Sequence, residues 1–251
     1  MCRHLAYLGP PVALASLLLD PPHSLLRQSY APADMRGGGT LNADGYGVGW
    51  YEPGARGPVR YRRAVPMWTD SSFTLLTQGV RSGAVLAAVR SATPGMPVME
   101  TASAPFTSGP WLFSLNGRVA GWPGSLVPLA AQLPVTDLLT LDAPTDSAVL
   151  WALVRHRLAD GQHPARVVAE VTAEVLRAAP GSRLNLLLTD GEQVVGTTVT
   201  HALSVRRDGC SVLIASEPTD TDPGWVPVPD GHLVVATAAA HDVYPIRTQE
   251  P

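Results

Sequence analysis

The order of the predicted elements constrains the fold of this 251-residue chain more than any other feature. Strand-like segments occupy residues 2–9, 45–52, 59–65, 84–93 and 111–122, and one helix is predicted at 71–80. A helix with apolar residues at helical spacing is predicted at 144–160 and a second helix at 164–181, after which the chain returns to strand-like segments. Because strands and helices do not alternate regularly, we expect helices packed over layered antiparallel sheets rather than a parallel βαβ sheet.

Turn and cap residues place the boundaries of these elements. Pro10 and Pro11 are expected to end the first strand and open a short helix at 12–20. Thr145 or Asp146 is expected to cap the first helix of the central pair. No linker divides the chain, so we predict a single domain over residues 2–251.

Composition excludes several classes of function. Only 16% of the residues are charged and the net charge is −3, which argues against a nucleic-acid or membrane-surface partner. No apolar run approaches the roughly 20 residues of a membrane span. Two cysteines give no disulfide framework, and the seven histidines lack the spacing of metal ligands. We therefore expect a globular cytoplasmic protein without a metal or other cofactor.

Cys2 is the first candidate catalytic residue. Removal of Met1 would leave the thiol and a free α-amine on one residue. An α-amine with a pKa near 7.7–8.0 can accept the proton of a thiol whose own pKa is near 8.5. The alternative is that Cys2 is a small buried apolar residue.

Three further stretches could complete such a site. Asn116-Gly117, in SLNGRV, offers a side-chain amide and a backbone N–H that could stabilise an oxyanion, although an ordinary Asn-Gly turn has the same sequence. Arg90 ends an apolar strand, where its guanidinium could bind a substrate carboxylate or an internal acid. Asp146 could bind a substrate ammonium group or only cap its helix.

Longer motifs show a resemblance to a known family. Cys2, Arg90 in RSAT, Asn116-Gly117 and Asp146 occur in the order found in class II glutamine amidotransferases, which are N-terminal-nucleophile hydrolases. Within that family the chain resembles the γ-glutamyl-hercynylcysteine sulfoxide amidohydrolases of ergothioneine biosynthesis. The stretches that carry this likeness are MCRHLAYLGPPVAL, LLLDPPHSLLRQSYAP, MRGGGTLNADGYGVGWY, SGPWLFSLNGRVAGW and SRLNLLLTDG.

The resemblance implies a four-layer αββα sandwich and removal of a γ-glutamyl group by hydrolysis, yielding glutamate and hercynylcysteine sulfoxide. No obligate protein partner is predicted. The chain departs from its relatives at Leu115, where His commonly precedes the Asn-Gly pair. The site residues expected are catalytic Cys2, Asn116 and Gly117, with Arg90, Thr93, Asp146, Asp44 and Gly45 binding the substrate.

Two other functions remain open on the sequence alone. The chain could be the glutaminase subunit of a two-chain amidotransferase, or a silent binder of glutamine-like ligands.

Two smaller expectations concern single side chains. Cys210, in GCSVLIAS, is expected in the core, and at least one of Tyr30, Tyr46 and Trp111 is expected beside the substrate's trimethylammonium group.

Overall fold

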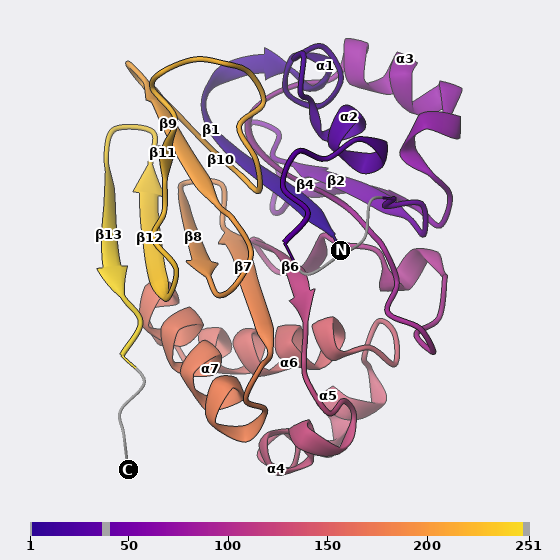
Figure 1. Ribbon diagram of the computed structural model, residues 1–251, viewed down its shortest axis with the longest axis vertical. Helices are drawn as coiled ribbons and strands as arrows, with labels where there is room; N and C mark the ends of the chain where they lie inside the picture. The colour runs from indigo at the N-terminus through magenta and orange to yellow at the C-terminus, as the bar shows by residue number, and fades with distance from the viewer. Residues whose placement is uncertain (1, 37–40, 248–251) are drawn as a thin grey trace.

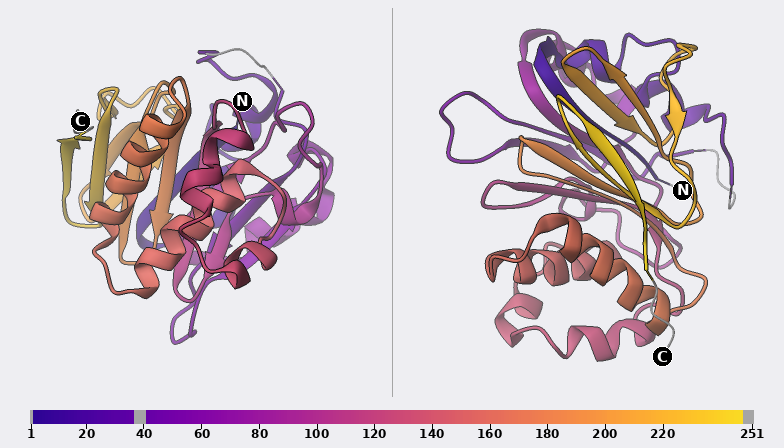
Figure 2. Two further views of the ribbon diagram at one scale, coloured as in Figure 1. Left: turned by 90° about the horizontal axis from the view of Figure 1, so that it is seen from below. Right: turned by 90° about the vertical axis from the view of Figure 1, so that its left-hand side faces the viewer.

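A computed structural model describes residues 2–36 and 41–247. Two antiparallel sheets stack face to face, and helices cover the outer face of each (Figures 1 and 2). The described chain has no helix that combines the length and the apolar character needed to cross a membrane.

The first sheet has seven strands and places β1 near its centre. Along the sheet the strands are β11 (Val226–Pro227), β9 (Ser204–Asp208), β10 (Ser211–Ala215), β1 (Arg3–Ala13), β4 (Arg81–Val89), β2 (Tyr46–Trp50) and β3 (Val59–Arg63). The strand that follows Cys2 is therefore held on both edges, by β10 and by β4.

The second sheet has six strands. Their order is β13 (His241–Pro245), β12 (His232–Thr237), β8 (Gln193–Thr198), β7 (Arg183–Thr189), β6 (Trp111–Arg118) and β5 (Phe106–Ser108). Asn116 lies in β6, opposite Asn185 of the neighbouring strand β7.

Helices form two separate outer layers (Figure 1). The layer on the first sheet contains α1 (Leu14–Leu18), α2 (Leu25–Tyr30) and α3 (Ser71–Gly79). The layer on the second sheet contains α4 (Val127–Ala130), α5 (Val135–Leu139), α6 (Asp146–Ala159) and α7 (Pro164–Ala178). Short 3₁₀ turns lie at Met67–Thr69, Glu100–Ala102 and Gly124–Leu126.

Three apolar layers hold this stack together. One lies between the first sheet and α1–α3, one between the two sheets, and one between the second sheet and α6–α7. Side chains that alternate along β1 contribute to two of these layers. Leu5 and Tyr7 face the helices, while Ala6 and Leu8 face the second sheet. The αββα architecture predicted from the sequence is confirmed.

The prediction that Pro10 and Pro11 start a helix is wrong. β1 continues through both prolines to Ala13, and α1 begins only at Leu14. The pairing of β1 with β4 shifts register between Leu8 and Val12, so the prolines occupy an irregular part of the ladder. A bulge of this kind tolerates residues that have no N–H to donate.

Cys210 is also misplaced by the sequence reasoning, because it lies exposed in the turn between β9 and β10 instead of in the core. The apolar stretch that follows it, from Val212 to Ala215, is buried as expected. The predicted cap of α6 is confirmed, since the Thr145 hydroxyl accepts a hydrogen bond from the Ala148 N–H at 3.2 Å.

Candidate active site

A cleft opens at the start of β1, where the ends of β4 and β6 and the first turn of α6 meet. It brings together side chains that lie far apart in the sequence. Its lining includes Cys2, Arg90, Thr93, Gly117 and Asp146. Five of the eight predicted site residues therefore share one cleft.

Cys2 reaches this cleft from the residue before β1 begins. Its side chain is half-buried, and the thiol Sγ lies 3.8 Å from the carbonyl oxygen of Ser91. β-strand side chains alternate, so Cys2 shares the inter-sheet side of β1 with His4. Met1 lies outside the described residues.

The Asn116-Gly117 pair lies at the end of β6, opposite β7. Gly117 lines the cleft, and a Cβ atom there would lie 1.9 Å from the carbonyl oxygen of Arg183, so only glycine fits. The Asn116 side chain is buried, and its Nδ2 donates to Ser216 Oγ at 3.3 Å. Asn116 Oδ1 has no hydrogen-bond partner among the described residues. The pair is thus a rigid element and not a solvent-exposed turn.

Asp146 is a buried carboxylate at the first residue of α6. Its Oδ2 accepts from the Val119 N–H and its Oδ1 from the Ser147 N–H, both at 2.8 Å. Burial raises the pKa of this carboxyl above its usual value, although both hydrogen bonds and the charge of Arg90 act in the opposite direction. A carboxylate in this state gains from a further cation.

Arg90 is a half-buried cation whose Nη1 donates to the carbonyl oxygen of Pro97 at 2.9 Å. No carboxylate of the described chain lies within ion-pair distance of it. The alternative that Arg90 only neutralises an internal acid therefore lacks a partner, and the guanidinium retains donors for a ligand.

Asp44 and Gly45 lie behind the cleft and do not line it. Asp44 Oδ2 accepts from the Ala92 N–H at 2.8 Å, and the Asp44 N–H donates to the Arg90 carbonyl at 3.0 Å. The Gly45 carbonyl accepts from the Arg90 N–H at 2.7 Å. A side chain at Gly45 would collide with Ser103 Oγ. Both residues therefore hold the segment that carries Arg90 and Thr93.

Comparison with known proteins assigns the family. A model described as glutamine amidotransferases class-II matches residues 23–210 of the chain. The chain belongs to the class II glutamine amidotransferase family.

Two mycobacterial relatives are similar to this family member over nearly their whole length. The γ-glutamyl-hercynylcysteine sulfoxide hydrolase of Mycolicibacterium smegmatis is 44% identical over 236 residues, which cover 93% of this chain and 95% of the relative. The hydrolase of the same name from Mycobacterium tuberculosis (strain CDC 1551 / Oshkosh) is 42% identical, with 94% and 93% covered. A solved class-II domain protein from Silicibacter pomeroyi has the same fold, with a TM-score of 0.70, 21% identity, and 98% and 100% of the two chains covered.

Two buried histidines, His4 and His201, are uncharged near neutral pH. His4 is buried, its Nδ1 lies 2.8 Å from Ser114 Oγ, and burial lowers its pKa to about 3. Burial, followed by the nearby arginines, lowers the pKa of His201 to about 4. In this family member neither histidine competes with an α-amine as a base at neutral pH.

The aromatic residues expected near the substrate lie elsewhere. Tyr46 is 1% exposed in the layer under α3, and its hydroxyl donates to Asp70 at 2.7 Å. Tyr30 and Trp111 also do not line the cleft. Trp122, which the sequence reasoning missed, lines a neighbouring pocket of about 480 Å³ that shares Asp146 with the cleft. Its only sequence signal was its place six residues after Asn116.

Two buried charges also escaped the sequence reasoning. Arg3 and Glu217 are 2% and 3% exposed and form an ion pair with an N–O distance of 2.6 Å. They are far apart in the chain, and no local pattern joins them. Leu115, at the position where relatives commonly have His, is 7% exposed and lines the cleft beside Gly117.

Proposed function

We propose that the protein hydrolyses γ-glutamyl-hercynylcysteine sulfoxide to glutamate and hercynylcysteine sulfoxide, through a thioester on Cys2. The observation that carries this proposal is the cleft in which a thiol, a cation and a buried carboxylate meet. Relatives that match over more than nine-tenths of both chains are γ-glutamyl-hercynylcysteine sulfoxide hydrolases, and we infer the leaving group from their substrate.

The charges of the cleft fit the free amino-acid end of a γ-glutamyl group. Arg90 binds the α-carboxylate, because a guanidinium can donate to both carboxylate oxygens at once. Asp146 binds the α-ammonium group, which compensates a carboxylate that burial has destabilised. Thr93 contributes a hydroxyl to the same cleft. An ordinary peptide lacks this pair of free charges on the acyl side of the bond.

The chemical step begins on Cys2 once Met1 has been removed. The α-amine takes the thiol proton, Sγ attacks the side-chain carbonyl carbon of the glutamyl group, and a tetrahedral oxyanion forms. The C–N bond then breaks, and the α-ammonium returns its proton to the leaving amine. Water, deprotonated by the same amine, cleaves the thioester to give glutamate and regenerate the thiol.

Asn116 and Gly117 stabilise the oxyanion in this scheme. An Asn amide has two N–H donors, and the bond to Ser216 uses one of them. The Gly117 N–H is the second proposed donor, on a residue that lines the same cleft as the thiol. Donors held in a fixed position stabilise the developing charge without reorganising during the reaction.

We propose further that residues 2–251 act as one catalytic domain without an obligate partner chain. The two mycobacterial relatives, matched over 95% and 93% of their length, are named as hydrolases, a class of enzyme in which water is the acceptor. We infer that water is the acceptor in this protein as well.

A comparison of three substrates tests the proposal. Glutamate release would be measured for γ-glutamyl-hercynylcysteine sulfoxide, γ-glutamylcysteine and glutamine, on protein whose intact mass shows Met1 removed. We expect the first substrate to have the highest kcat/KM. Preference for glutamine would indicate a glutaminase subunit instead, and binding without hydrolysis of any of the three would indicate a silent ligand binder.

A further inference from the structure

Arg3 does not line the cleft, but lines a small pocket with Asn116, Ser216 and Glu217. Side chains alternate along a strand, so Cys2 and His4 face the second sheet while Arg3 faces the side of α2. Its side chain is only 2% exposed. A guanidinium is seldom buried unless each of its charged donors has a partner.

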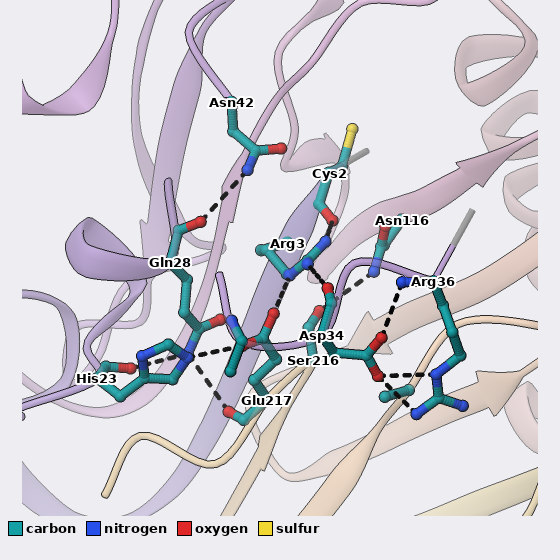
Figure 3. A network of polar contacts seen from close by, with 12 residues as sticks. Cys2, Arg3, His23, Gln28, Asp34, Arg36, Asn42, Asn116, Ser216 and Glu217 are labelled. Carbon is teal, nitrogen blue, oxygen red and sulfur yellow. Dashed lines mark hydrogen bonds and ion pairs between the residues drawn. The ribbon is translucent and has the colours of Figure 1, made fainter. Parts of the chain in front are cut away.

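Each nitrogen of the Arg3 guanidinium has a different acceptor (Figure 3). Nε donates to Glu217 Oε1 at 2.6 Å, Nη1 donates to the carbonyl oxygen of Cys2 at 3.0 Å, and Nη2 donates to the carbonyl oxygen of Asp34. One side chain therefore connects the nucleophile's own peptide group to two segments distant in sequence.

Glu217 is held as completely as its partner. Its Oε2 accepts from His23 Nε2 at 2.6 Å and from the Ala33 N–H at 2.8 Å, while Oε1 accepts from Arg3. The register of β1 with β10 pairs Leu5 with Ala215, and this pairing brings Arg3 next to Glu217 just beyond the ladder. The ion pair is thus fixed by the pairing of β1 with β10 and by the segments on either side of α2.

We propose that Arg3 and Glu217 are positioning residues that orient Cys2 for attack, an inference that rests on the proposed function. Cys2 precedes the first residue of β1, and the ladder with β4 begins one residue later, at the pair of Arg3 and Val89. The Nη1 bond to its carbonyl oxygen sets the orientation of that group, and with it the directions of the α-amine and the thiol. An error of about 1 Å in such a placement can cost about 10²-fold in rate.

The test separates positioning from stability. Breaking a buried ion pair by removing one partner is strongly destabilising, whereas replacing both partners with apolar residues is often neutral. We expect Glu217→Met alone to lower the Tm. The double variant Arg3→Met/Glu217→Met should recover the Tm but keep kcat about 10²-fold below the unmodified protein, with KM changed less than about threefold. The matched control is Arg157→Met/Glu174→Met, which removes the 2.6 Å ion pair between α6 and α7 and should leave kcat unchanged.

A milder variant keeps the proposal testable if the double variant does not fold. Arg3→Lys retains the charge beside Glu217, but a single ammonium cannot replace three donors in a planar fork. We expect a Tm near that of the unmodified protein and a kcat lowered about tenfold, which corresponds to about 1.4 kcal/mol and lies near the lower end for a hydrogen bond that involves a charged group.

Thiol alkylation gives a readout that needs no substrate. Iodoacetamide modification of Cys2, followed by peptide mass spectrometry, should slow about tenfold in the double variant, since a misdirected amine no longer deprotonates the thiol. Exposed Cys210 is the internal standard and should react at an unchanged rate. Recovery of kcat and of Cys2 alkylation together with the Tm would show a purely structural ion pair and overturn the inference. Absence of hydrolysis by the unmodified protein would instead overturn the proposed function, and the alkylation ratio would still test the pair.

Discussion

The charged groups on the two sides of β1 differ in how many hydrogen-bond and ion-pair partners they have within the described chain. On the cleft side, Arg90 has no carboxylate within ion-pair distance in the described chain, and Asp146 is a buried carboxylate with a raised pKa. On the opposite side, each nitrogen of Arg3 has an acceptor and both oxygens of Glu217 have donors.

This difference explains why charged groups that lack partners and charged groups that have a full set of partners occur around the same thiol. A buried charge without a full set of partners costs free energy, and a ligand that supplies the missing partners recovers part of it. A saturated pair gains nothing from a ligand and serves to fix geometry. We therefore assign binding to the cleft face and positioning to the face under α2, and four measurements can break or sharpen this division.

The largest expected effect is loss of the nucleophile. Cys2→Ala should abolish hydrolysis while the Tm stays within about 2 °C, because a half-buried thiol contributes little to packing. Cys2→Ser should retain at most a trace of activity, since an amine of pKa near 8 deprotonates an alcohol poorly. Cys210→Ala is the matched control and should keep full activity. Hydrolysis by Cys2→Ala would remove the basis of the mechanism.

The second effect is loss of an oxyanion donor. Asn116→Ala should lower kcat about 10²–10³-fold with a modest change in KM. Its cross-strand partner supplies the control, because Asn185 is also buried but bonds only to backbone groups around residues 199–202. Asn185→Ala should lower the Tm and leave kcat of the folded fraction intact. If the two variants behave alike, Asn116 is a structural residue.

The third effect is loss of the guanidinium group that we propose binds the substrate carboxylate. Arg90→Lys should raise KM for every γ-glutamyl substrate about 10–100-fold, because an ammonium cannot grip a carboxylate bidentately. Arg60→Lys is a suitable control, since Arg60 also donates through Nη1 to a proline carbonyl but does not line the cleft. An unchanged KM in Arg90→Lys would place the substrate carboxylate elsewhere.

The smallest effect is one of pH. Burial raises the pKa of Asp146, so its carboxylate should be lost at a pH above that at which an exposed Asp titrates. Below that pKa, KM should rise about tenfold per pH unit as the ammonium loses its partner. The same shift means that ionised Asp146 destabilises the fold above its pKa and that this penalty disappears as pH falls through it.

Glu217 should respond in the opposite sense. Burial acts to raise its pKa, but the hydrogen bond from His23 and the charge of Arg3 outweigh it, so its pKa is lowered. The stability that Glu217 contributes is therefore present at neutral pH and lost only as pH falls through that lower pKa. Mild acid should raise KM before it lowers the Tm, which parallel kinetic and thermal scans would show. Simultaneous changes would contradict the division between the two faces.

Much of the fold and of the cleft face could be predicted from local sequence. Thr145 before apolar residues at helical spacing indicated the start of α6, and strand periodicity located β2, β6 and β7. The resemblance gave five residues that the structure gathers in one cleft. These features depend on neighbours in the chain or on short motifs, which a single sequence displays.

The errors and omissions depended on pairing between distant segments. Pro10 and Pro11 were read as a helix start because a local pattern does not show the irregular register with β4 that accommodates them. Cys210 was assigned to the core because the position of the turn before β10 was not evident. Arg3 and Glu217 could not be joined, since only the β1–β10 register brings them together. The Arg3–Glu217 pair therefore cannot be predicted from the sequence until the pairing of β1 with β10 is known.

The central place of β1 also sets an order of events during synthesis. β1 is the first strand to be made, but its partner β10 begins at Ser211, so the ribosome completes most of the chain before the strand has both neighbours. At about 5–20 residues per second, the start of the chain stays without that neighbour for roughly 10–40 s. The trimming of Met1 that the mechanism requires has this interval in which to occur, before Arg3 closes on Glu217. The topology of one sheet therefore leaves time for this trimming before the strand that carries the nucleophile is paired on both edges.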